Sequence, residues 1–77
     1  MAYKITLDTD NDKHNKIQAL KVVNDSGRST TDLRFHFIKD NDKRVCIVTT
    51  YDEHETLPKE IQDVGINYKG LVQQTLS

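Results

Sequence analysis

Two alternating runs joined by a short polar turn constrain the fold of this chain more than any other feature. In the first run, Leu33, Phe35 and Phe37 alternate with other residues, and the second, "RVCIVTTY" (44–51), is rich in β-branched residues. Between them lies the polar stretch "KDNDK". A period of two is typical of strands, and a short connection favours antiparallel pairing. The sequence therefore predicts a β-hairpin over residues 33–51.

Shorter patterned segments lie on both sides of this hairpin. Residues 3–7 alternate apolar and polar side chains and predict a strand, whereas "NKIQALKVVND" has the spacing of a helix. "TLPKEIQDVG" fits a second, short helix, and residues 66–72 alternate around Gly70, which predicts a last strand. The order β-α-β-β-α-β predicts an α+β fold of the ferredoxin-like kind, a four-stranded antiparallel sheet with two helices on one face.

The ends of the two helices are marked by polar residues and glycines. Asp12 or Asn15 is suited to cap the start of the first helix. Gly27 lies where helices commonly stop in the left-handed conformation, and Gly65 is placed to end the second helix.

Two short stretches, "NKIQALKVV" and "DVGINYK", resemble parts of the C-terminal domain of the ribosomal stalk protein. In that family an asparagine-lysine pair opens the first helix and a glycine leads into the last strand. The chain carries "GRSTTDLRFHF" where the family has a glycine- and lysine-rich second helix for contacts with translation factors. The resemblance implies an alternative β-α-α-β-α-β layout, in which residues 30–40 are helical.

Length, charge and cysteine content limit the class of protein. At 77 residues the chain is expected to form one domain over 1–77, and a net charge of −1 gives no bulk attraction to nucleic acid or anionic membrane. No apolar run approaches the roughly 20 residues that span a bilayer, and the first residues lack the apolar core of a signal peptide. The only cysteine, Cys46, cannot form an intrachain disulfide. We expect a cytoplasmic protein with no membrane partner.

Two acidic stretches have the composition of metal sites without their spacing. "LDTDNDKH" begins like a calcium loop, but counting from Asp8 it has Lys13 where glycine is needed and Ala19 where the closing glutamate belongs. "DEHE" (52–55) surrounds a histidine with carboxylates, but four consecutive side chains point in different directions. Both stretches are interpreted as solvated loops or turns, and no metal is predicted.

A nucleophilic site is not predicted either. Cys46 and His36 could face one another across the hairpin, but no third group orients them and a flat sheet offers no pocket. The three glycines are scattered and form no phosphate loop. The expectation is a protein with no catalytic residues, no enzymatic activity and no cofactor.

The second face of the predicted sheet would be open to solvent and carries both aliphatic and basic side chains. Aliphatic residues on such a face suggest coverage by another protein or by a second copy in a homodimer. A register slip of one residue would exchange the two faces. The residues predicted to bind a partner are Arg34, His36, Ile38, Arg44, Val48, Lys69 and Leu71.

The predicted function is that of a small non-enzymatic interaction module. It would act as a regulator, adaptor or inhibitor that binds another protein through the open face or an edge strand. Its size is typical of accessory proteins of bacteria and their phages. The alternative is a nucleic-acid-binding module that uses a mildly basic face made of Lys4, Arg34, Arg44 and Lys69.

Overall fold

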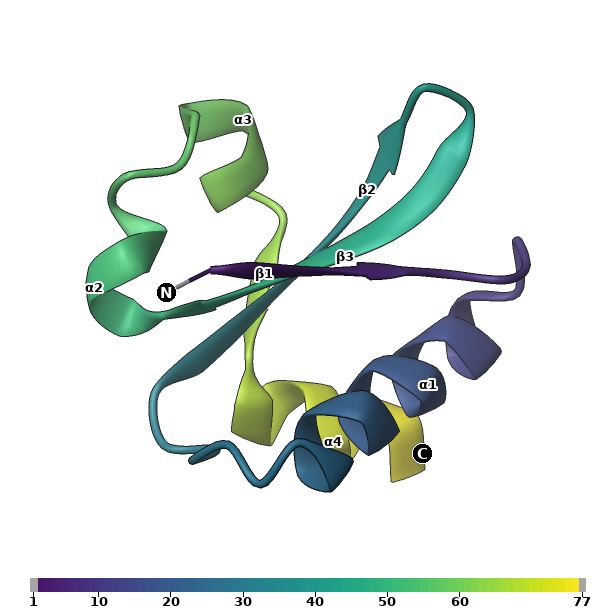
Figure 1. The fold of residues 1–77 in the computed structure, drawn as a ribbon, viewed down its shortest axis with the longest axis horizontal. Coiled ribbons are helices and arrows are strands. Elements are labelled where there is room, and N and C mark those ends of the chain that lie inside the picture. The colour runs from purple at the N-terminus through teal and green to yellow at the C-terminus, as the bar shows by residue number, and fades with distance from the viewer. Residues whose placement is uncertain (1, 77) are drawn as a thin grey trace.

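The computed structural model describes residues 2–76, which form a four-stranded antiparallel sheet with helices on both faces (Figure 1). The order of the strands across the sheet is β1-β3-β2-β4. In chain order the elements are β1 (Tyr3–Thr6), α1 (Asp12–Asp25), β2 (Leu33–Asp40), β3 (Lys43–Thr50), α2 (Tyr51–His54), α3 (Lys59–Gln62), β4 (Gly65–Asn67) and α4 (Tyr68–Leu76).

The predicted hairpin is confirmed and forms the centre of the sheet. β2 and β3 pair from Leu33 opposite Thr50 to Asp40 opposite Lys43. The two residues between them, 41 and 42, have φ angles of 49° and 66°. Two left-handed residues give the turn a twist that matches that of the strands, and asparagine and aspartate tolerate this conformation better than most residues. The local chemistry of "DNDK" therefore sets the register of the hairpin.

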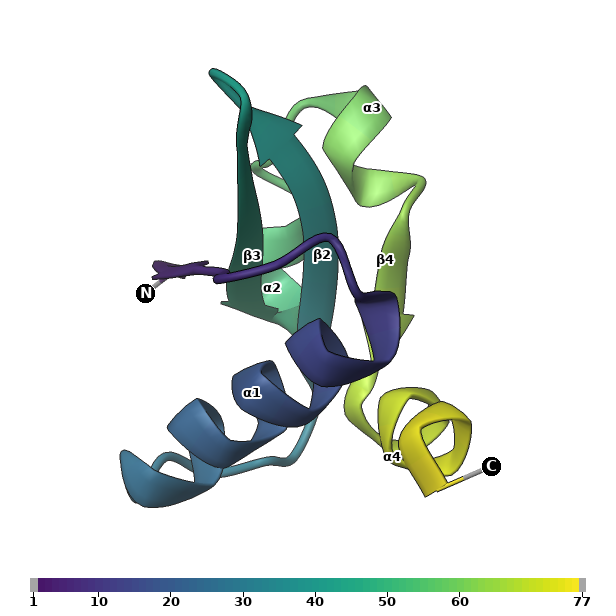
Figure 2. The same ribbon diagram turned by 90° about the vertical axis from the view of Figure 1, so that its right-hand side faces the viewer.

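The α+β class and the antiparallel sheet are confirmed, but the end of the chain differs from the prediction. Residues 33–40 are a strand, so the alternative layout with a helix at 30–40 is wrong. The last strand, β4, is only three residues long, and α4 follows it directly. Figure 2 shows β4 next to β2 and leading into α4. The side chain of Asn67 accepts a hydrogen bond from the Gly70 N–H at 2.7 Å and caps this helix.

The helices lie on both faces of the sheet, whereas the sequence predicted them on one. α1 and α4 pack together on one face, with a hydrogen bond from Lys16 to Gln74 at 3.1 Å. α2 and α3 cover part of the other face (Figure 1). The main core lies between the sheet and the α1–α4 pair. Its buried members are Ile5, Leu7, Ala19, Val23, Leu33, Phe35, Cys46, Val48 and Leu71.

The faces of β3 are the reverse of those predicted. Cys46 lies opposite Phe37 and Val48 lies opposite Phe35, so both point into the main core. Val45 and Ile47 lie on the face that carries α2 and α3. Helices cover both faces of this strand, so both rows of side chains are apolar and alternation cannot distinguish them. Assigning the two rows from alternation alone therefore placed each row of β3 on the wrong face.

The start of α1 is capped by neither of the two predicted residues, Asp12 or Asn15, whereas its end is as predicted. The Asn11 side chain accepts a hydrogen bond from the His14 N–H at 3.0 Å. Asn15 is buried instead and donates to the Thr9 carbonyl at 2.7 Å. Gly27 follows the helix with φ 69°, the left-handed stop expected from the sequence.

Candidate functional site

The seven residues predicted to bind a partner do not share one surface. Val48 and Leu71 are fully buried in the main core, so the expectation that they lie on an open face is wrong. Alternation along β2 places His36 and Ile38 on the α2–α3 face, where His36 is fully buried and Ile38 is partly exposed. Lys69 is exposed in the first turn of α4.

The two arginines of the predicted basic face lie on opposite faces of the sheet. Arg44 pairs with Lys39, two residues beyond Phe37, and so belongs to the α1 face. Its guanidinium contacts Asp10 at 3.1 Å and Asp12 at 3.7 Å. Arg34 belongs to the other face, where it lies 5.5 Å from the centre of the Tyr51 ring. These positive charges therefore form no continuous patch.

His36 is buried beneath α2 and α3 with both ring nitrogens engaged. Nδ1 lies 2.9 Å from the Ile61 carbonyl, and because a carbonyl only accepts, Nδ1 donates. Nε2 of the neutral ring is then free to accept from the Thr49 hydroxyl at 3.3 Å. The ring stacks on His54 with centroids 5.2 Å apart, and the backbone of Gly65 closes against it. His36, Thr49 and His54 thus form a polar cluster beneath α2 and α3. None of the pockets described is lined by these residues.

The surroundings of His36 and Cys46 disfavour acid–base or nucleophilic chemistry. Burial lowers the pKa of His36; the hydrogen bond to Ile61 opposes this effect, and the nearby charges of His54 and Arg34 add to it. Burial raises the pKa of Cys46 to about 12, so its thiol stays protonated. Since Cys46 lies opposite Phe37 and His36 lies opposite Ile47, the two side chains point to different faces. The pairing considered from the sequence is therefore wrong.

The lowered pKa of His36 predicts that the fold loses stability in acid. The unfolded chain has a histidine pKa near 6.5, so between that value and the lower folded value unfolding takes up a proton. The contribution of His36 to the free energy of unfolding is therefore fully present above about pH 6.5, and it falls as the pH drops below that value. Urea unfolding of wild type and His36→Gln at several pH values measures this. The difference in the free energy of unfolding between wild type and His36→Gln should become smaller as the pH falls.

A control for this pH dependence is His14→Gln, because His14 is exposed at the start of α1. It should follow the wild-type pH profile. An identical profile for His36→Gln and wild type would contradict the assignment of the acid sensitivity to the buried ring.

A polar groove lies where the loop before β2 meets the start of α4. Its volume is about 550 Å³. It brings together Arg34 and Lys69, two of the predicted residues, and Asp32 adds a negative charge to the same lining. The groove is lined by Thr30, Thr31, Asp32, Leu33, Arg34, Asn67, Tyr68 and Lys69. Two of the predicted site residues thus share a pocket here.

β1 is an edge of the sheet, and half of its backbone groups point away from the protein. β1 pairs only with β3, and the Leu7 N–H donates to the Arg44 carbonyl at 2.8 Å. In an antiparallel ladder, alternate residues point their N–H and C=O groups to the same neighbour. Tyr3, Ile5 and Leu7 therefore face β3. The N–H and C=O groups of Lys4 and Thr6 face outward, with no backbone partner among residues 2–76.

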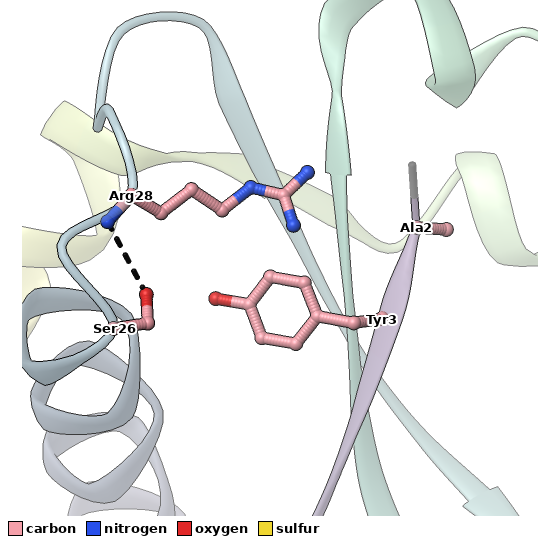
Figure 3. Close-up of a pocket in the computed structure, with 4 residues that line it drawn as sticks. All are labelled: Ala2, Tyr3, Ser26 and Arg28. Atoms are coloured by element: carbon pink, nitrogen blue, oxygen red, sulfur yellow. Dashed lines mark hydrogen bonds between the residues drawn. The ribbon is translucent and has the colours of Figure 1, made fainter.

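A shallow pocket adjoins the beginning of this edge (Figure 3). It is lined by Ala2 and Tyr3 of the edge segment and by Ser26 and Arg28 of the segment that follows α1. The Arg28 guanidinium carbon lies 4.6 Å from the centre of the Tyr3 ring, and its terminal nitrogen lies 3.7 Å from a Glu53 carboxylate oxygen. The pocket thus combines the aromatic ring of Tyr3 with the positive charge of Arg28, which Glu53 helps to position.

Sequence reasoning named an edge strand as one possible contact but did not identify β1. The missing information was which strand is at the edge, and this depends on pairing between distant segments. The only local signal was the shortness of the run at 3–7 and its exposed lysine, Lys4, features that are typical of protected edges.

No three histidine, cysteine, aspartate or glutamate side chains within residues 2–76 come together in a group that could hold a metal ion. Across the same residues, no helix is both long and apolar enough to cross a membrane. Comparison of the whole chain with known protein families, curated proteins and solved structures found no match in any of the three.

Proposed function

We propose that this protein is a small non-enzymatic interaction module that binds an extended polypeptide segment at the β1 edge. The observation that supports the proposal is the outward row of N–H and C=O groups at Lys4 and Thr6. An added strand can pair with such groups as it would with a neighbouring strand of the same sheet. The module would serve as a regulator, adaptor or inhibitor of the protein that supplies the segment.

The faces of the sheet support this proposal less well than its edge. One face is buried under α1 and α4, and α2 and α3 cover part of the other. β4, the opposite edge, has only three residues, Gly65–Asn67, and offers a shorter ladder. β1 therefore gives the longer exposed edge of the described sheet.

The pocket at Tyr3 and Arg28 would supply selectivity that the backbone ladder lacks. Backbone hydrogen bonds are the same for every sequence, so discrimination must come from side-chain pockets beside the added strand. The Tyr3 ring provides an apolar surface and Arg28 a positive charge above it. We expect the selected segments to place an aromatic or acidic side chain at this position.

A displayed library of random linear peptides tests the proposal, with Thr6→Pro as the decisive variant. Proline removes the outward N–H and places its ring where the added strand would lie, while an edge strand tolerates it on the solvent side. Peptides selected on the wild type should bind Thr6→Pro about tenfold or more weakly, since a net hydrogen bond contributes about 1 kcal/mol and the ring adds a clash. Thr6→Ala keeps the N–H and is the matched control. Equal binding to both variants would refute the edge as the site.

The alternative function, nucleic-acid binding, makes a different prediction in the same assay. Its best remaining site is the groove of Arg34 and Lys69, since Arg44 and Lys4 are paired with carboxylates elsewhere. Binding of a labelled single-stranded oligonucleotide there would fall with Lys69→Glu, fall steeply with salt, and be unaffected by Thr6→Pro.

A cytoplasmic setting is part of the proposal. Cys46 is a buried thiol in a chain with no second cysteine, so the fold neither uses nor needs oxidising conditions.

A further inference from the structure

We propose that the segment bound at the β1 edge is β1 of a second copy, so that two four-stranded sheets join into one across a two-fold axis at Thr6. This inference rests on the proposed use of the edge and names its partner. A two-fold contact brings the same surface of both copies together, so the edge must be complementary to itself.

The outward residues decide the register of such a pairing. Backbone groups face outward at alternate positions, so Lys4 or Thr6 lies at the axis or flanks it. With Lys4 at the axis, two lysines would lie directly opposite one another, which is destabilising. With Ile5 at the axis, Lys4 would lie opposite Thr6 and gain no charge partner. These two registers are therefore the less favourable ones.

With Thr6 at the axis, the cross-strand pairs from Lys4 to Asp8 are favourable. The two Thr6 residues exchange N–H···O=C bonds in both directions, and threonine pairs are a stabilising combination. Lys4 then lies opposite Asp8 of the other copy, at both ends of the ladder, and Ile5 lies opposite Leu7. Both charged residues are exposed, and Lys4 exchanges its present contact with Asp40, at 2.9 Å, for a carboxylate of the second copy.

The flank of α1 beside β1 carries one exposed apolar side chain, Val22, that the same axis would cover. Gln18 donates to the Asp8 side chain at 3.3 Å, and Ser26 lines the pocket with Tyr3, so this side of the helix follows the strand. Val22 lies one turn from each of them and is 37% exposed. Joining two sheets at β1 brings this flank of α1 next to its copy, with Val22 between the two helices.

The contact is small, and its affinity should be correspondingly low. One strand pair and one helix flank are at the lower end of the areas that stable interfaces bury. We expect a dissociation constant on the order of micromolar to tens of micromolar. Dimerisation should therefore depend on concentration in an accessible range.

Sedimentation equilibrium from about one micromolar to about one millimolar tests the pairing. The wild type and Thr6→Ala should dimerise, and Thr6→Pro should sediment as a monomer with an unchanged circular dichroism spectrum. A wild type that is monomeric throughout would overturn the self-pairing. It would leave the proposed function standing if library peptides still distinguish Thr6→Pro from Thr6→Ala. A dimer unaffected by Thr6→Pro would place the interface elsewhere and overturn the inference.

A charge exchange tests the register within the same experiment. Lys4→Glu places like charges opposite one another at both ends of the ladder and should weaken dimerisation about tenfold. Adding Asp8→Lys to the same chain restores opposite charges and should recover most of that loss. Without recovery in the double variant, the Thr6-centred register is wrong. Exposed ion pairs contribute little to folding, so all these variants should stay folded.

Discussion

Phe35→Ala should lower the free energy of unfolding by about 3–5 kcal/mol, the largest effect expected of a single side chain in this protein. Phe35 is fully buried, and its ring centre lies 6.0 Å from that of Tyr68 in α4. Its neighbours across the ladder are Val48 of β3 and Ile66 of β4, so three elements, β3, β4 and α4, close around it. Removing the ring loses its burial and leaves a cavity that these elements cannot fill by moving independently.

Phe37→Ala is the matched control for this prediction. Phe37 lies two residues along the same strand and faces the same core, but it is only partly buried. Its removal should cost about 1–2 kcal/mol. Urea unfolding of both variants, followed by circular dichroism, gives the two values. A cost for Phe37→Ala equal to or greater than that for Phe35→Ala would contradict the placement of Phe35 at the centre of the core.

Gly65→Ala should lower the free energy of unfolding by about 2–3 kcal/mol through overpacking. A methyl group there would lie 2.4 Å from Cε1 and 2.6 Å from Nδ1 of His36. The ring cannot move away easily because it is bound to Ile61 and Thr49 and stacked on His54. The φ angle of Gly65 is not positive, so the cost comes from lack of space and not from backbone strain.

Gly70→Ala makes the same chemical change in α4 and is the control. Its new methyl group would come no closer than 3.2 Å, to the Asn67 side chain that caps the helix. The higher helix propensity of alanine, about 1 kcal/mol, offsets this crowding, so stability should stay within about 1 kcal/mol of wild type. If the two glycine variants are equally stable, the close packing of Gly65 on His36 is refuted.

A second variant separates the steric cause from a general disturbance of β4. His36→Ala removes the atoms that the new methyl group would meet. The costs of Gly65→Ala and His36→Ala should therefore not add, and the double variant should be clearly more stable than their sum predicts. Additive costs would show that Gly65 is required for another reason.

Much of the candidate site lay beyond sequence reasoning. The sequence predicted seven residues for an open face, but Val48 and Leu71 are buried, and Arg34 and Lys69 line a groove at the start of α4. It proposed an edge strand without identifying which, because edges depend on pairing order. The sequence predicted that Gly65 ends a helix. In the structure Gly65 leaves room for the ring of His36, 29 positions earlier in the chain.

The sequence alone determined the features set by neighbouring residues. The hairpin with its polar turn in "KDNDK", the helix over "NKIQALKVVND" and the stop at Gly27 follow from alternation, spacing and local backbone preferences. Only the tertiary structure decided the faces of β3, since "VCIV" is apolar on both sides and the register comes from pairing. It also decided that Tyr68 begins a helix. Tyr68, Leu71 and Val72 fit helical spacing as well as a strand, and packing of Leu71 against the core favours the helix.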